Sequence, residues 1–181
     1  MPAGGSYEGI ARPRGRGRRR GFKPGAAADG DMHRFEDMTV GFSETYGDHE
    51  MTEAGIIAFA EQFDPQPMHT DPEAAAETGY GGLIASGLHT VGVATRLMVE
   101  HFLNDSSNRG GLGIDDLTWH RPVRPGDVLR VRHEVVDRRE SGSHPDAGIV
   151  VRDVEVLADD GDGEAVVCSW TVAILMGKRE P

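Results

Sequence analysis

The sequence predicts an α+β fold in which an antiparallel sheet wraps around one long central helix. The longest apolar pattern with helical spacing begins just after Gly87, and four segments with strand spacing follow it, joined by short turns. A chain of 181 residues is long enough for one domain with a substantial core. A long apolar helix followed by closely connected strands is best buried by folding the sheet around it.

The first 31 residues differ in composition from the rest of the chain. They are rich in Gly, Pro, Arg and Ala and hold seven Lys/Arg against three Asp/Glu. Such a segment buries too little apolar surface to order itself, so we expect a disordered Arg/Gly-rich tail at 1–31 and a folded domain at 32–181. A basic arm that touches RNA or an acidic partner is the alternative, although a basic run without interleaved aromatic residues carries little recognition chemistry.

Three short elements are expected before the central helix. Residues 38–46 have the mixed pattern of an edge strand. Thr52 is placed to cap a helix that ends at the Asp64-Pro65 step, because a residue before proline avoids the helical region. Asp71 before Pro72 reads as the N-cap of a second short helix over Pro72–Glu77.

The central helix and the strands after it follow from periodicity. After a loop over 104–111, the spacing changes to that of strands, with a Pro-Gly-Asp turn and an Asp/Gly turn among the connections. The expected apolar stripe of the helix consists of Leu88, Val91, Ala94, Thr95, Met98 and Phe102. The expected strands are 112–121, 128–138, 147–158 and 164–176.

Charge and cysteine content narrow the classes of function. Residues 32–181 carry a net charge of −15, which argues against nucleic acid as a partner of the folded domain. Cys168, the single cysteine, lies in an apolar alternating run and is expected to be buried, which excludes a disulfide framework. No apolar run has the length of a membrane span, so we expect a cytoplasmic protein that does not bind membranes.

The segment Asp64-Pro65-Gln66-Pro67-Met68-His69 places a carboxylate and an imidazole five residues apart on a proline-stiffened loop. Downstream, Ser86 and Gly87 open the central helix, whose first backbone N–H groups lack partners within the helix and favour negative charge. A base, an acid and an anion-binding amide are therefore expected close together. Ser86 lacks the Gly-x-Ser-x-Gly context of a nucleophile, so we expect it to cap the helix.

These residues resemble the MaoC-like (R)-specific enoyl-CoA hydratases and dehydratases, which have the hot-dog fold. The likeness spans about residues 35–177, and its strongest section runs from Phe59 through Pro72 to Ala85-Ser86-Gly87. That section is similar to the family's Asp-x-Asn-Pro-x-His signature, which is followed by a glycine that opens the central helix. Residues 119–127, which end in Pro125-Gly126-Asp127, are similar to a second family turn.

The resemblance implies a role for each matching position. Asp64 would activate water, His69 would orient that water and supply the proton, and the amide of Gly87 would hold the thioester oxygen. Thr95 falls where relatives often carry a hydroxyl and would hold the Asp-bearing loop through a hydrogen bond.

The chain also departs from the family pattern. Gln66 replaces the usual Asn, Phe63 replaces a frequent Gly, and Ser86 stands where many relatives have His. A related subgroup reads Asp-Pro-Gln-Pro with a later Ala-Ser-Gly, so these departures indicate membership of a subgroup whose substrate need not be a simple fatty enoyl chain.

Other candidate residues have weaker support. His89, in the first turn of the central helix, and Gln66 are candidates for lining the substrate site, and Arg121, with Arg124, for meeting the phosphates of a nucleotide-like carrier. His101, His120 and His133 lack the spacing of metal ligands and receive no role. The large residues Met98, Phe102, Trp119 and Trp170 are expected in the core.

The predicted function is that of a hydro-lyase of fatty acid metabolism, acting on an enoyl or 3-hydroxyacyl thioester of CoA or acyl carrier protein. The acid-base chemistry requires no metal and no other cofactor. Hot-dog units leave a sheet edge uncovered, so a homodimer or a dimer-based hexamer is expected. A hot-dog acyl-CoA thioesterase and a non-catalytic acyl-thioester-binding subunit remain as alternatives.

Overall fold

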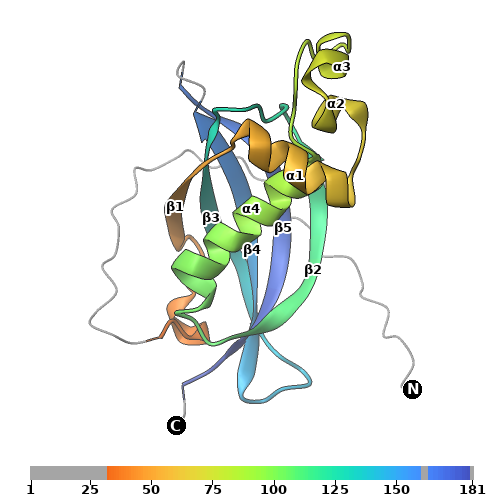
Figure 1. Ribbon diagram of the computed structural model, residues 1–181. Coiled ribbons are helices and arrows are strands. Elements are labelled where there is room, and N and C mark those ends of the chain that lie inside the picture. The colour runs from red at the N-terminus through yellow and green to blue at the C-terminus, as the bar shows by residue number, and fades with distance from the viewer. Residues whose placement is uncertain (1–31, 160–162, 180–181) are drawn as a thin grey trace, which may run out of the picture.

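One antiparallel sheet of five strands, in the order β1-β3-β4-β5-β2, curves around the central helix α4 (Figure 1). This computed structural model describes residues 32–159 and 163–179, so the tail expected at 1–31 lies outside the described residues. The strands are β1 (Ser43–Glu50), β2 (Asn108–Trp119), β3 (Val128–Glu140), β4 (Ala147–Asp159) and β5 (Glu164–Gly177). The fold class predicted from the sequence is confirmed.

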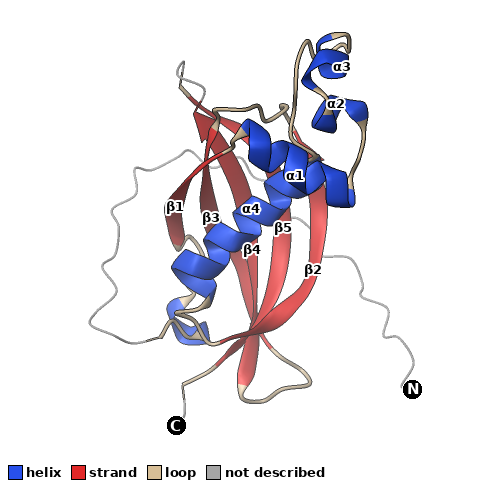
Figure 2. Ribbon diagram, viewed as in Figure 1, coloured by secondary structure: helices blue, strands red, loops and turns tan. Residues whose placement is uncertain are grey.

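Helix α4 (Gly87–Met98) crosses the concave face of the sheet and continues into a short π-helical segment, Val99–Leu103 (Figure 2). Its buried side chains are Thr90, Val93, Ala94, Leu97 and Met98. The predicted stripe is therefore rotated, because Leu88 and Thr95 are exposed. Apolar residues occur on both sides of this helix, so periodicity alone did not define the face that meets the sheet.

The edge strand β1 begins and ends later than predicted. Residues 38–42 precede the strand and include a turn at 40–41, and the strand extends past Tyr46 through a β-bulge between Gly47 and His49. Gly47 has φ +114, and a Cβ there would lie 2.8 Å from a methyl carbon of Leu97 on α4. Glycine therefore permits both the bulge and the close approach of the central helix.

Strand β2 forms the other edge of the sheet and begins at Asn108, inside the segment expected to be a loop. Its first half contains Gly110, Gly111 and Gly113, which normally indicate turns. Here they accompany breaks in register with β5, so the glycines bend the strand without ending it.

Three helices precede α4: α1 (Glu53–Phe63), α2 (Pro67–Thr70) and α3 (Pro72–Ala76). The predicted caps are confirmed, since Thr52 accepts a hydrogen bond from the Gly55 amide and Asp71 from the amides of Glu73 and Ala74. The short helix α2 was not predicted, because its four residues are too few for a periodic pattern. No helix in the described part of the chain is long and apolar enough to cross a membrane.

The Pro125-Gly126-Asp127 turn fixes the start of α1. Asp127 accepts a hydrogen bond from the Arg124 amide through its side chain and from the Met51 amide through its carbonyl, while the Gly126 amide donates to the Met51 carbonyl. Gly126 has φ +91, a conformation that favours glycine. The turn therefore anchors the chain immediately before the helix that leads to Asp64.

A buried polar cluster lies under the distal end of the central helix. Arg152 on β4 is 1% exposed, and its guanidinium stacks on the Phe102 ring at 4.6 Å. The Tyr46 hydroxyl lies 3.1 Å from Nδ1 of His133, which is fully buried and 3.5 Å from an Arg152 nitrogen. Burial, aided by the Arg152 cation, lowers the pKa of His133 from 6.5 to about 3.

This cluster predicts that acid weakens the fold through His133. Between pH 6.5 and 3 the unfolded chain binds a proton on this imidazole that the folded chain excludes, so the free energy of unfolding falls as the pH falls. Urea denaturation at pH 7 and 5.5 should show a flatter pH dependence for His133→Gln than for wild type, the difference approaching about 1.4 kcal/mol per pH unit. The exposed His144→Gln should keep the wild-type slope; equal slopes for all three proteins would contradict the prediction.

Candidate active site

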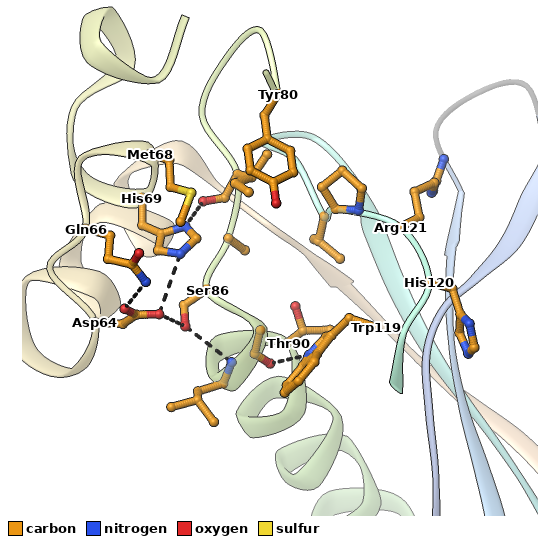
Figure 3. Close-up of a pocket in the computed structure, with 16 residues that line it drawn as sticks. Asp64, Gln66, Met68, His69, Tyr80, Ser86, Thr90, Trp119, His120 and Arg121 are labelled. Carbon is orange, nitrogen blue, oxygen red and sulfur yellow. Dashed lines mark hydrogen bonds and ion pairs between the residues drawn. The ribbon is translucent and has the colours of Figure 1, made fainter. Parts of the chain in front are cut away.

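One pocket, with a volume of about 480 Å³, opens where α2, the start of α4 and the end of β2 meet (Figure 3). The segment 83–86 crosses this region, and its position is set by two backbone bonds: the Ile84 amide donates to the Met68 carbonyl and the Ala85 amide to the Val123 carbonyl. Residues that line the pocket include Asp64, Gln66, His69, Ser86, Gly87, Trp119 and Arg121. The structure thus brings together the two signature segments recognised in the sequence.

Asp64 follows the last residue of α1 and turns its carboxylate into the pocket (Figure 3). Oδ1 accepts a hydrogen bond from Nε2 of Gln66 at 2.8 Å, and Oδ2 accepts one from the Ser86 hydroxyl at 2.7 Å. These hydrogen bonds, from Ser86 first and then Gln66, lower the pKa of Asp64 below its usual 3.8 and outweigh the effect of partial burial. The carboxylate is therefore ionised at neutral pH.

His69 is 5% exposed and is held by α2 rather than by a loop. Its Nδ1 lies 2.8 Å from the carbonyl oxygen of Ile84, which can only accept, so Nδ1 carries the proton. Nε2 is thereby the nitrogen that faces the Asp64 carboxylate, 3.5 Å from Oδ2. One imidazole nitrogen orients the ring, and the other is available for proton transfer.

Ser86 and Gly87 begin α4 beside this pair. The Ser86 hydroxyl oxygen accepts a hydrogen bond from the Leu88 amide at 3.3 Å, which confirms the predicted cap. Gly87 is the first helical residue, a position whose N–H has no partner within the helix. Its amide thus lies at the positive end of the helix, where a negative charge is favoured, and Gly87 lines the same pocket as Asp64.

Trp119, at the end of β2, forms the wall next to Gly87. Its indole Nε1 donates to the Gly87 carbonyl at 3.1 Å, and a Cβ on Gly87 would lie 2.5 Å from the indole ring. Trp119 is 49% exposed and lines the pocket, so the expectation that it belongs to the core is wrong. Trp170, Met98 and Phe102 are buried as expected, as is Cys168.

Two expected site residues lie elsewhere. Thr95 is exposed, and its hydroxyl donates to the Val91 carbonyl of its own helix, so it does not hold the Asp64 segment. His89 stacks on the Phe59 ring of α1 at 4.5 Å and is not among the residues that line the pocket. Helix geometry explains both: Thr90 lines the pocket, so His89, one residue earlier, and Thr95, five residues later, are rotated by about 100° and about 140° away from that face.

Sequence reasoning also missed several pocket residues. Thr90, which is 2% exposed, lies one helical turn beyond Gly87 on the pocket side. Its position three residues after Gly87 in the sequence could have identified it, because such residues share one face of a helix. Tyr80 lines the opposite wall, and its carbonyl accepts a hydrogen bond from Arg124 at 2.6 Å. The Ile84 carbonyl leaves no trace in the sequence, because any residue supplies a backbone oxygen.

The donor set of the site is that of acid-base chemistry. Within the described ranges 32–159 and 163–179, no group of three His, Cys, Asp or Glu side chains is arranged to hold a metal ion. The pocket instead combines an ionised carboxylate, an imidazole whose Nε2 is available for proton transfer, and a helix N-terminus. Together these groups can move a proton and stabilise a developing negative charge.

Comparison with known proteins agrees with this geometry. Residues 37–156 match the family profile described as the MaoC like domain. The chain belongs to this family. This MaoC-like domain is 32% identical to the 3-hydroxybutyryl-CoA dehydratase of Methylorubrum extorquens over 105 residues, which are 57% of the chain and 64% of that enzyme. The match thus spans less than two thirds of the dehydratase.

Solved structures support the same assignment. The MaoC-like domain superposes on a MaoC-like dehydratase from Rhodospirillum rubrum with a TM-score of 0.73 and 37% identity, covering 82% of this chain and 99% of the other. An (R)-hydratase from Pseudomonas aeruginosa shares the fold, with a TM-score of 0.65 and 23% identity over 82% of this chain and 88% of the other. The hot-dog architecture expected from the resemblance is thereby confirmed.

The contact between Gly87 and Trp119 predicts a strict size limit at position 87. Gly87→Ala should destabilise the MaoC-like domain by about 1 to 3 kcal/mol, because the added methyl overlaps the indole ring. Gly92→Ala on the same helix is the matched control, since a Cβ there meets nothing within 4 Å and alanine favours the helix. Thermal or urea unfolding compares the variants.

Removal of the indole should relieve the overlap. In a Trp119→Ala background, Gly87→Ala should cost less than it does in wild type, a coupling that a double-mutant cycle measures directly. Equal effects of Gly87→Ala in the two backgrounds would show that the indole does not limit this position.

Proposed function

We propose that this MaoC-like protein is a hydro-lyase that adds water to an enoyl thioester, or removes it from a 3-hydroxyacyl thioester. The observation that carries the proposal is the position of Asp64 Oδ2 and His69 Nε2, 3.5 Å apart in a pocket that also contains the first amide of α4. A carboxylate and an imidazole at this separation can share one water molecule, and the amide can bind the thioester oxygen.

In the hydration direction, Asp64 takes a proton from the bound water as the water oxygen bonds to C3 of the substrate. The π electrons of the C2=C3 bond move toward the thioester carbonyl, and negative charge develops on its oxygen. The Gly87 N–H, at the positive end of α4, stabilises that charge. The depressed pKa of Asp64 keeps the carboxylate ionised to receive the proton.

The second proton transfer completes the addition. His69, protonated on both nitrogens, gives its Nε2 proton to C2 as the enolate collapses, while Nδ1 keeps its hydrogen bond to the Ile84 carbonyl. Asp64 then carries the proton from water, and its passage to Nε2 across the 3.5 Å gap restores both groups. Dehydration follows the same steps in reverse.

We propose a thioester of CoA or acyl carrier protein as the substrate. The relative from Methylorubrum extorquens is named for its action on a CoA thioester. Arg121 lines the pocket and Arg124 supports the adjacent Tyr80 segment, so two cations lie at this end of an otherwise acidic domain. Guanidinium groups are suited to the phosphates that both carriers contain.

Asp64→Asn tests the proposal. The amide cannot accept the proton from water, so hydration of an enoyl-CoA panel, followed as loss of absorbance of the conjugated thioester, should fall at least about a hundredfold in kcat. Asp137→Asn is the matched control, because Asp137 is an exposed carboxylate on β3 that does not line the pocket. Circular dichroism should show both variants folded.

The outcomes separate the candidate functions. Hydration that persists in Asp64→Asn would refute the assignment of the base. Release of free thiol by the wild type without hydration would identify a thioesterase, and tight acyl-CoA binding without turnover would identify a non-catalytic subunit.

We also propose that the protein is a homodimer, or a hexamer built from dimers, joined through β2. This strand is a sheet edge of 12 residues, and such an edge normally pairs or is covered. Large apolar side chains are exposed on or beside it: Ile114 is 52% exposed, Trp119 is 49% exposed, and Leu88 at the start of α4 is 55% exposed. Burying them supplies an apolar interface core.

Ile114→Glu should therefore dissociate the assembly. Light scattering coupled to size-exclusion chromatography should give a dimer or hexamer for wild type and a smaller species for the variant, because a charge buried at the interface is costly. Val40→Glu is the control, since Val40 is 63% exposed but lies before β1 at the other sheet edge. A monomeric wild type would refute the proposed assembly.

A further inference from the structure

Both oxygens of Asp64 are held by side chains at positions where this chain departs from the family signature. Gln66 stands in place of the usual Asn and donates to Oδ1, while Ser86 stands where many relatives have His and donates to Oδ2. Each bond is short, at 2.8 and 2.7 Å, and each uses one carboxylate oxygen (Figure 3). The two departures thus meet at a single group.

Ser86 does more than donate to the carboxylate. Its hydroxyl oxygen also accepts from the Leu88 amide at the start of α4, and the side chain is fully buried. A continuous path of hydrogen bonds therefore leads from the N-terminal turn of the central helix, through one hydroxyl, to Oδ2. Gly87 lies between Ser86 and Leu88 in the chain. The Asp64 carboxylate is therefore bonded to the same helical turn that carries the Gly87 amide.

Gln66 constrains the carboxylate from the opposite side. It is the N-cap residue of α2, with extended backbone angles set by the following Pro67, and its carbonyl accepts from the His69 amide. Its side chain reaches back two residues to Asp64. A longer amide than Asn is able to make this contact, which links the base to the short helix that carries the acid.

We propose that Gln66 and Ser86 are positioning residues that together hold the Asp64 carboxylate in its ionised form and in one orientation toward His69 and the Gly87 amide. This inference rests on the proposed hydratase function for its catalytic meaning. Two fixed hydrogen bonds leave the carboxylate little rotational freedom, which favours a single reactive geometry.

The pKa of the Asp64 carboxyl is lowered, which agrees with this role. Ser86 is the largest cause of its lowered pKa, and Gln66 is the next. A hydrogen bond donated to the carboxylate favours its charged form, whereas packing against it alone would raise its pKa through desolvation.

The test is a direct titration of Asp64 in the full chain. Carbon-13 NMR of aspartate-labelled protein follows the side-chain carboxyl carbons with pH, and loss of one resonance in Asp64→Asn assigns the signal. In Ser86→Ala and in Gln66→Leu the midpoint of this signal should move up, toward the value of an ordinary aspartate. In Gln66→Glu it should move up as well, because a second carboxylate then faces Oδ1.

Two controls match these substitutions. Thr95→Val removes an exposed hydroxyl from the same helix, and Gln62→Leu removes an exposed amide from α1; neither residue lines the pocket, and both variants should keep the wild-type midpoint. Because Gln66 is exposed, its variants keep the test valid even where Ser86→Ala weakens the fold. An unmoved midpoint in all Gln66 and Ser86 variants would overturn the proposal.

Kinetics then separates this inference from the proposed reaction. The acid limb of kcat/KM for enoyl-CoA hydration should follow the NMR midpoint in each variant, with kcat about tenfold lower where the orientation is lost. Shifted midpoints in a protein without hydratase activity would support the two hydrogen-bond roles and count against the reaction. Hydratase activity with unmoved midpoints would support the reaction and refute the positioning role.

Discussion

The burial of α4 along the concave face of the sheet is the constraint on which the rest of the structure depends. Helix and sheet share one hydrophobic core, to which Val93, Ala94 and Leu97 contribute from the helix and Val131 and Val154 from the strands. Because the helix cannot slide without opening this core, its N-terminus has a fixed place. That end carries Ser86 and Gly87, so core packing also determines where the site is built.

The chemistry is assembled from short segments that the core holds in register. The Asp127 turn anchors the start of α1, Asp64 follows the last residue of α1, and Ile84 supplies the carbonyl that orients His69. None of these contacts is large. Together they fix the positions of Asp64 and His69 relative to each other at the pocket.

Much of the fold could be predicted from the sequence because its signals are local. The caps at Thr52 and Asp71, the proline that ends α1 and the alternating strands are all written in neighbouring residues. The predictions failed where distant residues determine the structure. The glycines of β2 indicate a turn when the sequence is considered alone, but they lie in a strand because that strand pairs with β5. The buried face of α4 likewise depends on the sheet that the helix meets. For the same reason the spacing of Asp64, His69 and Gly87 indicated the site, whereas Trp119 and the Ile84 carbonyl did not.

The interlock of Gly87 with Trp119 has a consequence for how this domain can evolve. Two positions 32 residues apart share one volume, so a side chain at position 87 becomes accessible only after the aromatic residue at 119 has shrunk. The order of substitutions then matters. Replacement of Trp119 by a small residue would make room for side chains at position 87 that the indole now excludes. A change in the shape of the pocket wall that begins at Trp119 would thus come before any substitution at Gly87.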